Sequence, residues 1–222
     1  MRVSQAALAA GITTLLCANA VAAQHLREDS FKWFFGVTGG ALIFETQTQT
    51  HSGLPTTGIQ ALIMAKRAAL QISIEESFGS NEMSAFGDPT APNGSRDVSF
   101  DRIRKYSAIL MAFPVRAKVE PYLGVGWGIL HTVNTEVQGF FTSPFLGSLA
   151  EEEAKQRGST GFGTLLGGVQ GRITPSIVLF GQYQITTSPS SSSLLVGPSH
   201  SITAGLRFSL GSAKEGIQGG GY

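Results

Sequence analysis

The sequence places serine and histidine side by side at Ser199-His200-Ser201, which are residue types that could supply a nucleophile and a general base. A strand is predicted there, and neighbouring residues on a strand point to opposite faces. Adjacent Ser and His residues therefore do not form a nucleophile–base pair, and no Asp or Glu lies nearby in the sequence to orient the imidazole. We predict no catalytic residue and no enzyme.

The remaining histidines and the glycine pairs give no ligand site. His25, His51 and His131 share no spacing that would suit a metal ion. Gly124-Val125-Gly126 and Gly161-Phe162-Gly163 superficially resemble phosphate-binding turns, but no helix pattern follows either one. We therefore predict no metal and no cofactor, and we interpret the glycines as positions of close packing within strands.

The first 23 residues have the features of a secretory signal peptide. Arg2 gives the charged start, an apolar stretch lies around residues 6–16, and small residues lead up to Ala23. We expect residues 1–23 to be removed on export and residues 24–30 to form an N-terminal lead.

Cysteine usage and charge exclude several classes of protein. The one cysteine, Cys17, lies within the predicted signal, so a disulfide framework and a cysteine nucleophile are excluded from the mature chain. Cleavage removes only Arg2 from the 16 Lys and Arg residues, which leaves 15 against 15 Asp and Glu residues. A balanced charge provides no basic field, so we predict no nucleic-acid partner.

Apolar residues alternate along the chain instead of forming long runs. Beyond residue 30 no window holds the ~20 apolar residues of a spanning helix, so a membrane-spanning chain must cross with strands. In 119–131 one face carries Val119, Pro121, Leu123, Val125, Trp127 and Ile129, whereas the other carries glycine and polar residues. A period of two with one apolar face indicates a strand.

Eight such segments are predicted, and the connections between them alternate in length. The strands are 31–44, 58–65, 69–78, 102–115, 119–131, 161–173, 176–186 and 200–210. Long connections at 45–57, 79–101, 132–160 and 187–199 alternate with short ones at 66–68, 116–118 and 174–175. This asymmetry is typical of an all-β, eight-stranded antiparallel up-and-down transmembrane barrel, with tight periplasmic turns and longer outer loops.

The third outer loop contains a helix signal. Ser148 and Glu151 have the spacing of a capping box, and an acidic run follows. We predict one short helix there, ended by Gly158. Residues 212–222 follow the last strand without a pattern, and we predict a loose C-terminal tail.

Two segments resemble the family of small eight-stranded outer-membrane β-barrel proteins, of the porin-like or opacity type. They are Pro121-Tyr122-Leu123-Gly124-Val125-Gly126-Trp127-Gly128 and His200-Ser201-Ile202-Thr203-Ala204-Gly205-Leu206-Arg207-Phe208. The resemblance covers residues 31–211 and implies residence in the bacterial outer membrane. It also implies contact with outer-membrane lipid and lipopolysaccharide, and assembly by periplasmic chaperones and the barrel-insertion machinery. Family members usually end on an aromatic strand residue, whereas fourteen residues follow Phe208 here.

Alternation also predicts which side chains face the lumen. The inward faces are expected to carry a charge network of Glu75, Arg104, Glu120, Arg172 and Arg207, together with Tyr106 and Tyr122. We expect Glu120, Arg172 and Arg207 to neutralise one another near the periplasmic end, and Glu75 to pair with Arg104 near the other end. The preferred interpretation is a structural plug, and the alternative is a gated polar path or a small-ligand site.

Aromatic residues near strand ends and in loops have two interpretations. Trp33, Phe35, Trp127 and Phe208 are predicted to form aromatic girdles at the headgroup level, with core packing in a soluble barrel as the competing interpretation. Phe140, Phe141 and Phe145 in the third outer loop are candidate contacts for an extracellular partner, or residues that dip into the membrane interface.

These observations favour a non-catalytic outer-membrane protein that contributes to envelope integrity or to adhesion through its outer loops. A soluble periplasmic barrel that binds an apolar ligand is the main alternative, and it requires apolar faces that point inward. A lipid-modifying barrel enzyme or a narrow channel is a further alternative.

Overall fold

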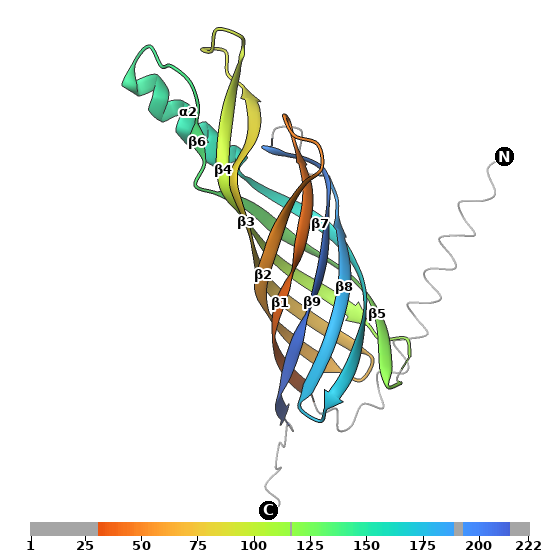
Figure 1. Ribbon diagram of the computed structural model, residues 1–222. Coiled ribbons are helices and arrows are strands. Elements are labelled where there is room, and N and C mark those ends of the chain that lie inside the picture. Colours follow the sequence, from red (N-terminus) through yellow and green to blue (C-terminus); the bar gives the residue numbers. More distant parts are fainter. Residues whose placement is uncertain (1–30, 116, 189–192, 214–222) are drawn as a thin grey trace, which may run out of the picture. The chain divides into compact units, whose positions relative to one another are not determined.

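A computed structural model describes residues 31–115, 117–188 and 193–213 (Figure 1). The predicted signal peptide, the lead at 24–30 and residues 214–222 of the predicted tail lie outside the described residues, while residues 212 and 213, which were also predicted to belong to the tail, continue the last strand. In chain order the described elements are β1 (Phe31–Thr46), β2 (Ser52–Ala65), β3 (Ala68–Gly87), β4 (Ser95–Ala112), β5 (Val119–Val133), β6 (Glu136–Val137), α2 (Pro144–Arg157), β7 (Ser159–Thr174), β8 (Ile177–Thr186) and β9 (Leu195–Ala213).

Eight of the strands close into one barrel. Their order is β3-β2-β1-β9-β8-β7-β5-β4, and pairing of β3 with β4 closes the ring. Strands that follow one another along the wall pair antiparallel, while the two-residue β6 adds only to the edge of β4. The predicted fold class, an eight-stranded antiparallel up-and-down barrel with a helix in the third outer loop, is confirmed.

The alternation of residues gives the barrel an apolar outside and a largely polar middle inside. On β5 the exposed fraction of Leu123 is 67%, whereas Tyr122 beside it is buried at 1%. Glycine allows neighbouring strands to pack closely, because a Cβ at Gly126 would collide with the carbonyl oxygen of Ala108 on β4. Side chains that point inward meet in the lumen, and those that point outward form an apolar belt.

The connections differ at the two ends of the barrel. At one end, which we call the turn end, β2 is joined to β3 through residues 66–67, and β7 to β8 through 175–176. Lys66 occupies the tight turn with a φ of 41°. The opposite end, which we call the loop end, carries the connections between β1 and β2, β3 and β4, β5 and β7, and β8 and β9. The predicted alternation of long and short connections holds only in part, because β4 is joined to β5 at the turn end through 113–118, which is longer than 47–51 at the loop end.

The predicted loop 79–101 is wrong, because most of it continues as strand. β3 extends to Gly87 and β4 begins at Ser95, so the two form a long hairpin that projects beyond the barrel. A register shift between Phe78 and Glu82 separates the barrel part of this hairpin from its projection. β2 and β9 likewise begin earlier than predicted.

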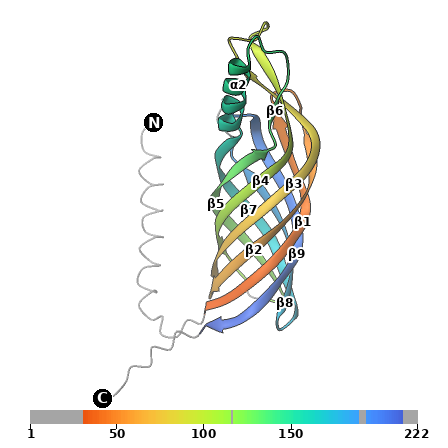
Figure 2. The same cartoon turned by 90° about the vertical axis from the view of Figure 1, so that its left-hand side faces the viewer.

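The helix also begins earlier than its predicted cap. Ser143 is the N-cap and its hydroxyl accepts from the Leu146 backbone N–H (3.4 Å), with Pro144 in the first turn. Ser148 lies inside the helix, where its hydroxyl donates to the Phe145 carbonyl (2.9 Å). The helix ends before Gly158, as predicted. Figures 1 and 2 both place α2 beyond the loop end, next to the β3–β4 hairpin.

Candidate functional site

The lumen consists of three layers of side chains. The layer at the turn end is apolar and is made by Phe34, Leu62, Met64, Ala69, Ile109, Met111, Phe113, Tyr122, Leu166 and Val178. The layer at the loop end is also apolar and is made by Leu42, Phe44, Leu54, Phe100, Ile103, Leu130, Phe162 and Leu195. Buried polar side chains fill the space between, among them Gln60, Gln71, Ser73, Glu75, Lys105, Ser107, Gln182, Gln184, Ser201 and Thr203. Arg207 and Gln170 are also buried, but they lie among the turn-end residues, where Arg207 is paired in register with Val178 and packs over Tyr122.

Arg207 on β9 is fully buried, with 0% of its surface exposed. Its guanidinium donates to the side-chain oxygens of Gln170 (2.6 Å) and Gln71 (3.0 Å) and packs 4.0 Å from the centre of the Phe180 ring. The Gln170 amide in turn donates to the Glu120 carboxylate at 2.8 Å. An amide therefore bridges a buried cation and an acid that sequence analysis expected to neutralise one another.

A direct ion pair lies in the central layer between Glu75 on β3 and Lys105 on β4. Their Nζ and Oε2 atoms are 2.5 Å apart, and 3% or less of either side chain is exposed. Lys105 also donates to Gln184 (2.9 Å) and Ser201 (3.3 Å). A buried pair held by further hydrogen bonds fixes the wall strands relative to one another.

The predicted pairing of Glu75 with Arg104 is wrong, because β4 has the opposite phase. Ser107 faces inward and its hydroxyl lies 2.7 Å from that of Ser73 on β3, which places Lys105 inside and Arg104 outside. Tyr106 is exposed on the outer wall for the same reason. Lys105, the cation of the central layer, was not among the predicted lumen charges.

Outside the wall, Arg104 joins a second group of charges. Both Arg102 and Arg104 donate to the Glu76 carboxylate on β3, at 3.0 Å and 3.2 Å. All three side chains are partly exposed. This exterior cluster was not predicted.

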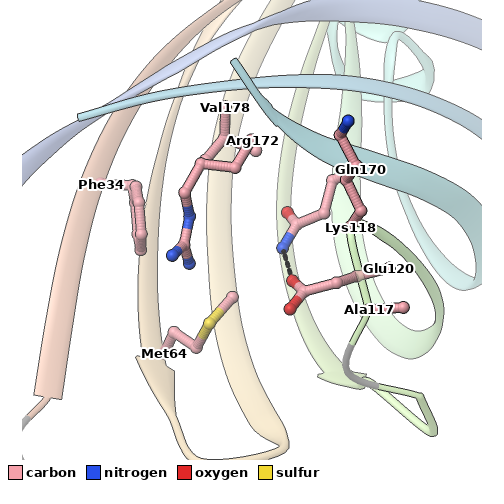
Figure 3. Close-up of a pocket in the computed structure, with 8 residues that line it drawn as sticks. All are labelled: Phe34, Met64, Ala117, Lys118, Glu120, Gln170, Arg172 and Val178. Carbon is pink, nitrogen blue, oxygen red and sulfur yellow. Dashed lines mark hydrogen bonds between the residues drawn. The ribbon is translucent and has the colours of Figure 1, made fainter. Parts of the chain in front are cut away.

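A pocket of about 190 Å³ opens at the turn end of the lumen. Figure 3 shows the Arg172 guanidinium and the Glu120 carboxylate pointing into it from β7 and β5. The pocket is lined by Phe34, Met64, Ala117, Lys118, Glu120, Gln170, Arg172 and Val178. Arg172 is exposed at this rim, so of the five predicted lumen charges only Glu75 and Arg207 are fully enclosed.

The four predicted girdle residues lie on the outer wall. Trp33, Phe35, Trp127 and Phe208 are all exposed there. Trp33 lies near the turn end of β1, and Trp127 lies further toward the loop end on β5. Their position relative to a headgroup layer stays a prediction.

The loop end carries its own small apolar core. Ala150 and Ala154 of α2 pack with Phe86, Val98 and Leu194. This core joins the helix to the β3–β4 hairpin.

The predicted loop contacts divide into two kinds. Phe140 and Phe145 are exposed, at 101% and 69%. Phe141 packs against the same core and lies 4.1 Å from the Arg96 guanidinium, so it is removed from the candidate contact surface.

The contact between a histidine and a serine in the described residues joins two strands, His131 on β5 and Ser159 on β7, and does not lie within Ser199-His200-Ser201. Ser199 and Ser201 are buried in the lumen, whereas His200 lies on the outer face beside Tyr183. His131 Nδ1 lies 2.6 Å from Ser159 Oγ on the outer wall. Among the described residues no acid is hydrogen-bonded to His131, and no group of three or more His, Cys, Asp or Glu could hold a metal ion.

No helix in the described part of the chain is long and apolar enough to cross a membrane.

Comparison with known proteins finds similarity in fold alone. No family model matches the sequence, and no curated protein matches it. The structure of Neisserial surface protein A (NspA) is 13% identical and aligns over 80% of this chain and 96% of that chain, with a TM-score of 0.50. The N-terminal β-barrel domain of Pseudomonas aeruginosa OprF is 8% identical over 79% and 96%, with a TM-score of 0.45. Ail, the attachment invasion locus protein of Yersinia pestis, is 12% identical over 82% and 100%, with a TM-score of 0.42.

The closed eight-stranded barrel therefore has the fold of the small outer-membrane β-barrels. The resemblance noted from the sequence is confirmed at the level of fold.

Proposed function

We propose that this chain is an integral outer-membrane protein whose barrel is a non-catalytic anchor for a contact surface at the loop end. The observation that carries the proposal is the reversed distribution of polarity in the wall. Arg207 and Lys105 are buried inside, while apolar residues such as Leu123 and Val125 are exposed outside. A wall of this kind is stable against hydrocarbon and unfavourable against water.

The height of the apolar belt supports the same proposal. The outward apolar set of β5 runs from Val119 to Ile129 and is followed by His131. Ten steps of ~3.4 Å span ~34 Å along the strand. A tilt of ~45° reduces this to about 25 Å along the barrel axis, which matches the apolar band of outer-membrane barrels.

The interior supports an anchor more than a channel or a soluble carrier. Packed apolar side chains occupy the lumen toward both ends, so a conducting path has to displace residues such as Phe44 and Phe113. A soluble barrel that binds an apolar ligand needs an apolar interior, and Arg207 with its glutamines opposes one.

The loop end supports a role in contact with molecules outside the cell. α2 and the β3–β4 hairpin are held by a packed core, so they present Phe140 and Phe145 on a defined scaffold. Exposed aromatic residues on a rigid support favour recognition of a partner. Lipopolysaccharide and other outer-membrane lipid would surround the wall, and periplasmic chaperones and the insertion machinery would act during assembly.

Membrane fractionation combined with a gel-shift assay tests the anchor. The mature protein should stay with the outer-membrane fraction and migrate differently in detergent gels before and after boiling. Release as a soluble protein on osmotic shock would contradict the proposal. Whole cells that carry Phe140→Ala/Phe145→Ala should keep the folded barrel but lose adhesion to host-cell or matrix-coated surfaces.

A further inference from the structure

The exterior charge cluster lies at the edge of the apolar belt nearest the loop end. On β4 the outward residues beyond Tyr106 are Arg104 and Arg102. On the two neighbouring strands Arg104 is paired in register with polar residues, Glu76 of β3 and His131 of β5. The exposed Phe78 of β3 lies one outward position further toward the loop end and is paired with Arg102, so the cluster lies where polar and aromatic residues replace the aliphatic belt. In a membrane this edge is where acyl chains give way to headgroups of the outer leaflet.

The cluster has more positive than negative charge. Glu76 is the single carboxylate that bridges Arg102 and Arg104, so two guanidiniums share one negative charge. Each guanidinium has five N–H donors, of which Glu76 occupies only a part. Asp101, the neighbouring acid on β4, accepts from Asn134 at 3.5 Å. An exposed ion pair contributes little to stability, so stability alone does not account for two arginines here.

We propose that Arg102 and Arg104 bind the phosphate of a phosphorylated lipid headgroup in the outer leaflet. The planar guanidinium group of arginine can donate two parallel hydrogen bonds to phosphate oxygens, and such charge-assisted hydrogen bonds are stronger than those between neutral groups. Toward the turn end the same wall presents Ile74, Tyr106 and Ile129 to the acyl chains of that lipid. A site that offers arginines for a phosphate next to an apolar surface for acyl chains favours a phosphorylated lipid over free phosphate.

Among the described strands, β4 alone places two arginines at this edge. On the other described strands the outward-facing residues in the half toward the loop end include no arginine. The site therefore belongs to one side of the barrel and predicts a lipid bound at a fixed place, in contrast to a uniform shell of lipid.

A lipid titration tests the proposal, which rests on the proposed membrane location. The full-length mature protein in a zwitterionic detergent is titrated with a bis-phosphorylated diglucosamine lipid, and the complex is counted by native mass spectrometry. Arg102→Gln/Arg104→Gln should weaken binding about tenfold or more, because two charge-assisted contacts are lost. Glu76→Gln should strengthen it severalfold, because the competing carboxylate is removed. Lys155→Gln removes one positive charge from the exposed side of α2 and should leave binding unchanged.

Several results would overturn the inference. They are unchanged binding by the double-arginine variant, weaker binding by Glu76→Gln, and equal binding of the same lipid without phosphates. Saturation by inorganic phosphate at the concentration that saturates with lipid would assign a free-phosphate site instead, and the lipid proposal would then be wrong. If the gel-shift assay shows that the double-arginine variant does not fold, the lipid site is tested by the binding of the Glu76→Gln variant and by the binding of the dephosphorylated lipid to the wild-type protein. Failure of the wild-type protein to fractionate with membranes overturns the proposed function itself, whereas loss of arginine dependence in a membrane-bound protein overturns only the lipid site.

Discussion

The wall of the barrel and its loop end follow opposite rules of burial, although β3 and β4 run through both. In the wall, Leu123 is exposed and Lys105 is buried. At the loop end, Phe86 and Val98 are buried, whereas the acidic residue Glu152 is exposed. The change falls at the register shift between Phe78 and Glu82. The β3–β4 hairpin thus has two different burial patterns. In the wall many of its apolar residues face outward, and in the projecting part Phe86 and Val98 are buried against α2.

A buried charge therefore has a different role in each of the two regions. In the wall, Lys105 is enclosed with Glu75 and is inaccessible to water, so loss of either partner leaves an uncompensated charge. At the loop end, Asp88 and Arg96 form a close pair beside a connection that faces solvent. The first pair should dominate global stability, and the second should act locally.

Glu75→Gln is the change with the largest expected effect. It leaves the Lys105 ammonium buried without its carboxylate, and breaking a buried pair typically costs about 3–5 kcal/mol. Urea unfolding in lipid bilayers should record this loss in the free energy of unfolding. The double variant Glu75→Gln/Lys105→Met should recover most of it, because no charge is then stranded. An unaltered unfolding midpoint for the single variant would show that the pair is hydrated in the folded protein.

Leu123→Arg tests the apolar belt directly and ranks next. A charged residue on the lipid face near the bilayer midplane destabilises a barrel by about 2–4 kcal/mol. The matched control is Glu152→Arg on the exposed face of α2, where surface substitutions usually stay within about 0.5 kcal/mol. If both variants unfold at the same urea concentration in bilayers, the wall does not face hydrocarbon and the comparison between the two regions fails.

Sequence alternation was sufficient to predict the barrel, because most wall strands have one apolar face. Gln71, Ser73 and Glu75 alternate with Ile72 and Ile74, and the structure places the two sets as predicted. The short connections fixed the up-and-down order. These two signals need only local patterns, which is why the fold class was predictable.

The phase of β4 was not predictable in this way. Arg102, Arg104 and Lys105 give charge to both faces of the strand, and Ile103 gives apolar character to the inner face. A tight turn fixes register, but β3 and β4 are joined at a distance by a projecting hairpin. The Ser73–Ser107 contact that sets the phase is visible only after the strands are paired.

Ser143→Ala at the loop end should have a smaller effect on stability than the two substitutions in the wall. Loss of the N-cap hydroxyl should destabilise α2 by about 1 kcal/mol. Hydrogen exchange should accelerate in α2 and leave the wall amides around Leu123 unchanged. A matching increase in the exchange of wall amides would show that helix and barrel unfold together.

Lowering the pH gives the smallest expected effect, confined to the tip of the β3–β4 hairpin. Hydrogen bonds from Arg96 and then Thr90 hold the pKa of the Asp88 carboxyl below its ordinary value. Because the folded-state pKa is lowered, this stabilisation is complete above the unfolded Asp value of about 3.9 and is lost as the pH falls through the folded-state pKa. Exchange protection of the amides at Ala91 and Gly94, corrected for intrinsic rates, should therefore fall only below about pH 4. Asp88→Asn should remove that pH dependence, whereas loss of protection already at pH 5 would assign the transition to another group.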